Sequence, residues 1–333
     1  MAEVTLTSFI VLGVALFMLL NSAAIAVYAE RRVAAFIQNR MGPNRVGPAG
    51  LLQPIADVLK LLLKEDVTPT EGNKFIHTVA PMIPVITALM TVAVIPFGEG
   101  LYATNINASV LYLLAVASLG VYGVTLAGWS SNSKYSLLGG LRAAAQMISY
   151  ELPLGMAVAS VVIFVGSLRV VDIAAYQETW WFVFLNPLGA IIFIIAAFAE
   201  SNRTPFDLVE AEQELVGGFH TEYSSMKFGM FFLAEYMHVV INSMLMTTFF
   251  FGAYHLPFAG YWLPELSPLV KGILDVSVFT IKTGFFIFLF IWVRWTIPRF
   301  KYNQVMKLGW SRLLPLSILN FIVIAGILFL IYG

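Results

Sequence analysis

Residues 200–223 of the chain read ESNRTPFDLVEAEQELVGGFHTEY and lie between two long apolar segments. The stretch combines six acidic residues with a single arginine, Arg203. A solvated acidic loop is one interpretation. However, the interleaved apolar side chains favour burial, so we expect acids that line a wet internal cavity. The six acids are Glu200, Asp207, Glu210, Glu212, Glu214 and Glu222.

The same stretch contains signals for a helix. Thr204 is a suitable N-cap, and Pro205 is suited to the first helical position. Gly217 and Gly218 are typical of a helix end about three turns later. On such a helix three of the carboxylates share one face, and they would repel one another strongly if they were buried. These three are Asp207, Glu210 and Glu214.

The composition places the chain in a membrane. Of its 333 residues, 59% are hydrophobic and 11% are charged, and the mean hydropathy is +0.84. Soluble domains carry about 25% charged residues. The formal net charge is zero, so nothing points to nucleic acid as a partner. The absence of cysteine excludes thiolate-held iron–sulfur clusters and disulfides within this chain. The histidines show no pairing at matched depth, so we predict no haem or metal site.

Apolar runs of about 20 residues are long enough to cross a bilayer. We therefore predict a single all-α polytopic membrane domain over residues 1–333, with eight transmembrane helices and both termini on the periplasmic side. Sixteen of the 19 lysines and arginines fall in four connections, which the positive-inside rule places in the cytoplasm. The spans are 5–28, 77–97, 107–129, 143–166, 182–199, 228–251, 271–293 and 313–332, and the cytoplasmic connections are 29–76, 130–142, 200–227 and 294–312. Pro81 and Pro84 should break or bend the start of the second span.

Residues 51–63 form a separate pattern in the first connection. Leucines, isoleucine and valine make one helical stripe, and Gln53, Asp57, Lys60 and Lys64 make the other. A helix of this length with one apolar face lies in the membrane interface and does not span it. It could serve as a surface anchor or could line the mouth of a lipid-accessible cavity.

Several ionisable residues fall inside or at the edges of the predicted spans. A charge at mid-membrane costs about 2.5–3.5 kcal/mol, so it normally faces water or a partner. Glu235 is followed by His238 one helical turn later. Together these ionisable residues predict an internal hydrophilic path suited to proton transfer. Its members are Glu151, Glu200, Glu235, Asp275 and Lys282.

Long motifs in the connections make the chain recognisable. The first connection carries ERR at 30–32 and QNRMGPNRVGP at 38–48, and the middle carries GWSSNSKY at 128–135 and AQMISYE at 145–151. AESNRTPFDLVEAEQEL at 199–215, TEY at 221–223, AEY at 234–236 and PRFKYNQ at 298–304 follow. With these motifs, nearly the whole chain resembles the H-type, quinone-site membrane component of respiratory complex I, the NADH:quinone oxidoreductase. Asn303 departs from the family pattern, in which Asp is expected in many relatives.

The resemblance implies a role in a proton-translocating enzyme of the respiratory electron-transport chain. Such a component forms the membrane side of the quinone chamber and couples quinone reduction to proton translocation through buried carboxylates. It holds no redox centre and binds no cofactor of its own. Quinone is the substrate, and FMN and iron–sulfur clusters belong to partner subunits. The implied partners are peripheral quinone-site and iron–sulfur subunits, small membrane subunits and antiporter-like subunits in a bacterial inner membrane.

The resemblance also implies roles for individual residues, in three groups. The first group would line the quinone tunnel or its mouth: Gln38, Arg40, Asp57, Lys60, Arg203 and Phe228. The second would couple quinone chemistry to protons: Glu151, Glu200, Asp207, Glu210, Glu212, Glu214, Glu222, Glu235, Arg142 and Lys282, the last as a counter-charge. The third would fix the loop at the chamber entrance: Glu30, Arg31 and Arg45.

Three alternatives remain at this point. A homologous component of a membrane-bound hydrogenase-type complex would share the fold but would lack a quinone chamber. An independent ion-coupled transporter would be expected to show internal repeats, and the sequence shows no convincing one. A purely structural scaffold would have no need of acids inside its spans.

Overall fold

The computed structural model describes residues 6–208, 215–257 and 267–332. The regular elements of these residues are all helices. The first half of the chain contains α1 (Leu6–Ile37), η1 (Pro48–Gly50), α2 (Gln53–Leu63), α3 (Lys74–Val79), α4 (Met82–Thr91), η2 (Val92–Val94), α5 (Ser109–Ser130) and α6 (Lys134–Val165). The second half contains α7 (Val170–Tyr176), α8 (Phe182–Leu185), α9 (Pro187–Glu200), η3 (Gly218–His220), α11 (Ser225–Phe250), α13 (Pro268–Thr296), α14 (Tyr302–Leu308), η4 (Gly309–Leu313) and α15 (Leu314–Tyr332).

Seven helical segments of the described chain are long and apolar enough to cross a membrane. This finding confirms the prediction of an all-α membrane protein. The segments are α1, Lys74–Val94, α5, α6, α11, α13 and Tyr302–Ile331, and each coincides with a predicted span. The predicted break in the second span is also confirmed, because α3 ends at Val79 and α4 begins at Met82, on either side of Pro81.

The predicted fifth span, 182–199, is not one helix. Asn186 separates α8 from α9, and its side-chain oxygen accepts a hydrogen bond from Gly189 N at 2.9 Å. Pro187 then occupies the first turn of α9, a position where its missing N–H costs nothing. The remaining 14 residues of α9 extend about 21 Å at 1.5 Å per residue, short of the roughly 30 Å hydrocarbon core.

Two long helices extend beyond their predicted ends. α1 continues to Ile37 although its predicted span stops at residue 28, and α6 begins at Lys134 although its predicted span starts at 143. Hydropathy marks where the apolar run stops, but helix formation continues through charged residues of good propensity. The connections at these two ends are therefore shorter, and more helical, than the sequence predicts.

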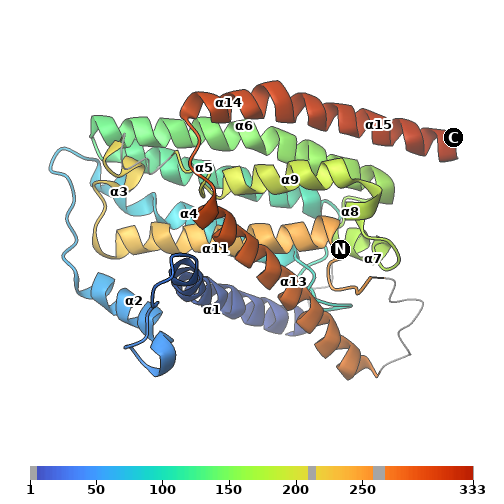
Figure 1. The fold of residues 1–333 in the computed structure, drawn as a ribbon, viewed down its shortest axis with the longest axis horizontal. Helices are drawn as coiled ribbons and strands as arrows, with labels where there is room; N and C mark the ends of the chain where they lie inside the picture. Colours follow the sequence, from blue (N-terminus) through green and yellow to red (C-terminus); the bar gives the residue numbers. More distant parts are fainter. Residues whose placement is uncertain (1–5, 209–214, 258–266, 333) are drawn as a thin grey trace.

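Figure 1 shows the arrangement of these helices. α6 runs through the bundle with α5 and α9 beside it, and α14–α15 lies along its outer side. α11 packs between α4 and α1, and α13 crosses obliquely over α1 and α11. The largest apolar core is built from α6, α9 and α11, and it contains fully buried rings such as Phe193 and Phe250. Dense packing around α6, α9 and α11 fixes the polar side chains that these helices carry.

The predicted helix that starts at Thr204 is wrong at its start. Residues 204–208 form turns, in which Phe206 N donates to the Arg203 carbonyl at 2.8 Å. Phe206 and Leu208 are buried in the main core, so tertiary packing outweighs the local capping signal. Glu210, Glu212 and Glu214 lie outside the described residues. The predicted end is confirmed, because Leu215 is helical and the chain turns at Val216 and Gly217.

The end of the acidic stretch is packed closely on α6. A Cβ on Gly139 would lie 2.7 Å from the backbone nitrogen of Phe219 and 2.9 Å from Gly218 Cα. Only glycine at position 139 lets η3 approach α6 this closely. This close contact places Phe219 and His220 inside the bundle, where both side chains line the cavity described below.

Candidate functional site

Arg203 connects two acids that lie far from it in the sequence. Its Nη1 donates to Glu30 Oε2 at 2.8 Å, and its Nε lies 2.6 Å from Glu235 Oε1. Glu30 comes from α1 and Glu235 from α11, whereas Arg203 follows the end of α9. The Arg203 side chain is 3% exposed. The arginine therefore places one positive charge between two carboxylates inside the protein.

Further residues complete this cluster. Arg294 on α13 approaches Glu30 Oε1 to 2.8 Å, so Glu30 is held between two guanidinium groups. The Arg203 guanidinium also lies 4.2 Å from the centre of the Tyr236 ring, a cation–π contact. Asp207 acts electrostatically on Glu235. We call Glu30, Arg203, Glu235 and Arg294 the ion cluster; it joins α1, α11, α13 and the acidic stretch.

The protonation state of Arg203 follows from these neighbours. Burial alone would lower the pKa of Arg203, but the carboxylates of Glu235 and Glu30 outweigh burial and raise that pKa. The guanidinium is therefore a permanent positive charge. Any change in the charge of Glu30 or Glu235 must alter the balance within the cluster.

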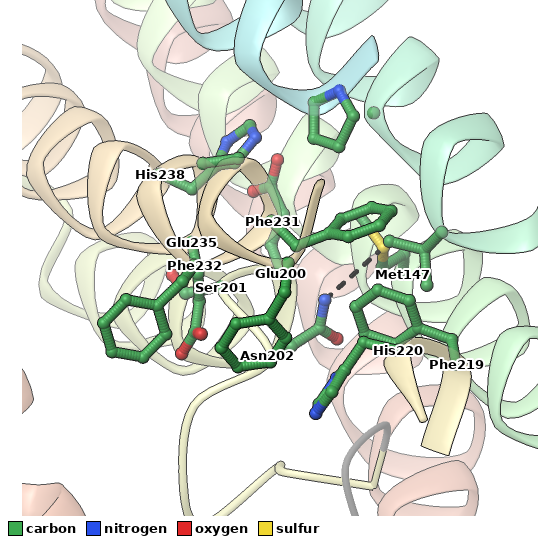
Figure 2. A pocket seen from close by; sticks show the side chains of 15 residues that line it. Met147, Glu200, Ser201, Asn202, Phe219, His220, Phe231, Phe232, Glu235 and His238 are labelled. Carbon is green, nitrogen blue, oxygen red and sulfur yellow. Dashed lines mark hydrogen bonds between the residues drawn. The ribbon is translucent and has the colours of Figure 1, made fainter. Parts of the chain in front are cut away.

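A cavity of about 70 Å³ lies beside the ion cluster. Figure 2 shows the side chains that line it, which come from α4, α5, α6, α9, α11 and the acidic stretch. Most of the wall is aromatic or aliphatic, and the titratable groups on it are Glu200, Glu235, His220 and His238. At about 10–15 Å³ per water molecule, the space is large enough for several waters. Of the acids in the acidic stretch that the structure describes, Glu200 thus faces an internal cavity, as the sequence predicts.

Glu200 differs from Glu235 in its surroundings. Within the described residues Glu200 makes no ion pair, and another acid, Glu151 on α6, acts on it electrostatically. Ser118 on α5 acts in turn on Glu151. Two carboxyl groups in one electrostatic neighbourhood tend to share a proton, because both cannot ionise cheaply. Glu200 and Glu151 are therefore suited to holding and exchanging a proton.

Aromatic contacts fix the end of the cavity wall that is formed by the acidic stretch. Burial lowers the pKa of His220 to about 4, so its ring is neutral at pH 7. The ring of His77 stacks on Tyr223 with centroids 3.9 Å apart, and the Tyr223 hydroxyl lies 3.2 Å from Ser130 Oγ. These contacts attach the end of the acidic stretch to α3 and α5. Glu222, between His220 and Tyr223, does not line the cavity.

The connection after α1 forms a separate group of contacts. Arg31 pairs with Asp57 of α2 at 2.7 Å, and Gln53 also donates to Asp57 at 3.1 Å. The sequence predicts that Glu30 and Arg31 act together, but in the structure each has its own partners. Arg40 Nε donates to Gln38 Oε1 at 2.7 Å, and both side chains are exposed. Lys60 and Arg45 are exposed too.

Helix α2 begins at Gln53, two residues after the predicted start. Its apolar side chains are exposed, among them Ile55, Leu59 and Leu62. The ion pair of Arg31 with Asp57 holds the opposite, polar side of α2 against the end of α1. The apolar stripe is therefore open to whatever surrounds the chain.

Lys282, in the middle of α13, lies in a different environment from the ion cluster. Its ammonium donates to the backbone carbonyls of Phe251, Ala253 and His255 at 2.7, 3.0 and 2.6 Å. It also lies 4.2 Å from the centre of the Trp181 ring. Gly252 has a φ of 75° and leaves room for that ring, since a Cβ there would lie 2.1 Å from Trp181 Nε1. Lys282 thus caps the carbonyls that follow α11.

We expect Lys282→Met to lower the free energy of unfolding by about 2–3 kcal/mol, because buried carbonyls lose their donor. The thermal inactivation midpoint of the solubilised protein in its complex measures this loss. Lys271→Met is the matched control on the same helix. Lys271 pairs with Glu99 on the surface, where an ion pair contributes about 0–1 kcal/mol. Equal midpoints for the two variants would contradict the capping role.

The structure brings only some of the predicted site residues together. The cavity and the ion cluster unite Glu30, Arg203, Phe228, Glu200 and Glu235. The other predicted residues of the first connection, together with Arg142 and Lys282, lie outside this group. Arg142 sits over the Tyr302 ring at 5.6 Å. Sequence reasoning missed Arg294, since a basic residue at a helix end is also typical of an interface anchor. It noted the spacing of Glu235 and His238 but gave His238 no role.

Comparisons with known proteins agree with this picture. Residues 9–325 match the model of a family described as NADH dehydrogenase. The chain is 57% identical over 317 residues to the H subunit of NADH-quinone oxidoreductase from Salinibacter ruber, covering 92% of each chain. It is 57% identical over 316 residues to NADH-quinone oxidoreductase subunit 8 of Rhodothermus marinus, covering 92% of this chain and 93% of the relative. It is 49% identical over 312 residues to the H subunit of the enzyme from Rhodospirillum centenum, covering 93% of this chain and 90% of the relative.

Proposed function

The chain belongs to the family of the H subunit of NADH-quinone oxidoreductase, and from this premise we propose that it forms the membrane side of the quinone-binding chamber and couples quinone reduction to proton translocation. As a membrane component of that complex it works with other subunits, and it is part of an oxidoreductase. The observation that carries the finer proposal is the buried ion cluster beside a cavity lined by Glu200 and Glu235.

Charge balance supports the coupling role. Reduction of a quinone adds electrons and draws protons from its surroundings, so the local electrostatic potential changes at each turnover. Arg203 is a fixed positive charge, whereas the carboxyl groups of Glu235 and Glu200 can change protonation. A buried network of this kind responds to a nearby charge by moving protons, because low-dielectric surroundings make unbalanced charge costly. Glu151 and Glu200 would take the proton onward toward the middle of the bilayer.

The quinone path is proposed for the first connection and the start of the acidic stretch. Gln38, Arg40, Asp57 and Lys60 lie at the end of α1 and on α2, where polar side chains meet an exposed apolar stripe. A long isoprenoid quinone needs an apolar route for its tail and polar groups for its head, and this region offers both. Phe228 on the cavity wall offers an aromatic surface deeper inside.

The remaining proposals concern position in the membrane and partners. We propose that α2 lies in the cytoplasmic interface plane with its apolar stripe in lipid. α9 would make the eighth, shorter membrane segment, and both termini would face the periplasm, as the distribution of basic residues predicts. Arg142, Arg45, Arg31 and Glu222 would shape the cytoplasmic connections against peripheral subunits, which carry the FMN and the iron–sulfur clusters.

Photo-crosslinking with a quinone-headed azide probe tests the quinone path. Membranes that contain the assembled complex are labelled with and without excess natural quinone, and the labelled peptides are mapped. We expect labelling that natural quinone competes away within residues 38–63 or 203–227. Labelling confined to other subunits would contradict the quinone path and would favour the hydrogenase-type alternative.

A further inference from the structure

His238 occupies a position that the coupling proposal does not use. It lies on α11 one helical turn beyond Glu235, and it lines the same cavity as Glu235 and Glu200 (Figure 2). Its ring packs toward α5, where a Cβ on Gly120 would lie 4.0 Å from His238 Cε1. The imidazole thus shares one cavity with two carboxyl groups that come from different helices.

The backbone of Pro84 on α4 is close to this ring. Pro84 lines the cavity together with His238, and its backbone acts electrostatically on the imidazole. Because proline has no backbone N–H, only its carbonyl is available to a ring N–H. An imidazole has two ring nitrogens, so one N–H can face this carbonyl while the other nitrogen accepts a proton and releases it.

The charged surroundings favour transfer over permanent ion pairing. The titratable groups on the cavity wall besides His238 are Glu200, Glu235 and His220. Glu235 already contacts Arg203 at 2.6 Å, whereas Glu200 has no ion pair among the described residues. No lysine or arginine of the described chain lines the cavity itself. A proton that moves between the two acids has His238 and cavity water as its available carriers.

We propose that His238 is the proton relay between Glu235 and Glu200. When a proton leaves one carboxyl group, its O–H bond breaks and an N–H bond forms on the free nitrogen of His238. The cation then returns a proton, through cavity water, to the other carboxylate and becomes neutral again. No electron moves in this step, and the proton count is unchanged. The inference rests on the proposed coupling function and adds a carrier to it.

The test uses the complex in sealed membrane vesicles. His238→Asn can still donate a hydrogen bond to the Pro84 carbonyl but cannot take up a proton near pH 7. His238→Ala leaves a space that free imidazole can fill. We expect both variants to lower quinone reductase turnover and proton uptake by about tenfold or more, the order of a lost proton-transfer group. Imidazole added to His238→Ala should recover most of the lost rate, and added to His238→Asn it should not.

Met237→Ala is the matched control. Met237 is fully buried in the apolar core on the same helix. Its truncation to alanine leaves a cavity, as His238→Ala does, but removes no group that can carry a proton. Imidazole should leave the rate of that variant unchanged. Wild-type turnover and proton uptake in His238→Asn would overturn the relay. Failure of both His238 variants to assemble would also overturn it, because the side chain would then be structural.

Glu200→Gln separates the two proposals. If that variant also keeps wild-type turnover and proton uptake, the coupling function of the cavity has failed, and the relay fails with it. If Glu200→Gln is impaired while His238→Asn is normal, only the relay has failed, and protons cross the cavity through water alone.

Discussion

Arg203→Met is expected to abolish most quinone reductase activity and to destabilise the assembled protein by about 3–5 kcal/mol, the cost of leaving a buried charge without its partner. Arg203 contacts both Glu30 and Glu235 and is 3% exposed, so its loss strands Glu235 inside the bundle and leaves Glu30 with Arg294 as its remaining cation. The amount of complex in membranes and its thermal inactivation midpoint measure the effect.

Arg169→Met is the control for this prediction. Arg169 pairs with Asp172 on the surface at 3.7 Å, and its side chain is 38% exposed, so the change should cost about 1 kcal/mol at most. Combining Arg203→Met with Glu235→Gln should recover part of the lost stability, because one stranded charge is removed with its partner. An Arg203→Met complex that is as stable as the Arg169→Met complex would show that Arg203 does not stabilise the buried carboxylates of the ion cluster.

Glu200→Gln is expected to lower coupled quinone reduction by about tenfold or more while leaving assembly unchanged. Glutamine keeps the shape of the side chain but cannot bind or release a proton. Glu200 makes no ion pair among the described residues, so the substitution strands no opposite charge. Turnover with quinone and the membrane potential in vesicles measure the effect. NADH oxidation by a water-soluble acceptor should be normal, because it needs only the peripheral subunits.

Glu178→Gln is the matched control for Glu200. Glu178 is an exposed acid in the turn after α7, away from the cavity, so its conversion to an amide should leave turnover and membrane potential unchanged. Equal behaviour of the two variants would remove Glu200 from the coupling path. Low activity with both quinone and the water-soluble acceptor would instead indicate a loss of assembly.

The sequence by itself was enough for the membrane class, the seven long spans and the family. Each of these depends on local information. The length of an apolar run sets whether a segment can cross hydrocarbon, and Pro81 interrupts a helix wherever it stands. The family followed from long contiguous motifs, and the comparisons confirm it. A cavity beside Glu200 was also predictable, because acids interleaved with apolar residues need internal space for a solvating group.

Only the tertiary structure decided which charges meet. Glu30 and Arg203 are 173 residues apart, and their contact depends on how α1 packs near the end of α9. Lys282 caps three backbone carbonyls that sequence patterns cannot locate. The turn at Thr204 replaced a predicted helix start because Phe206 is buried in the core. Hydropathy and capping act within one segment, whereas ion pairing and burial depend on the packing of several.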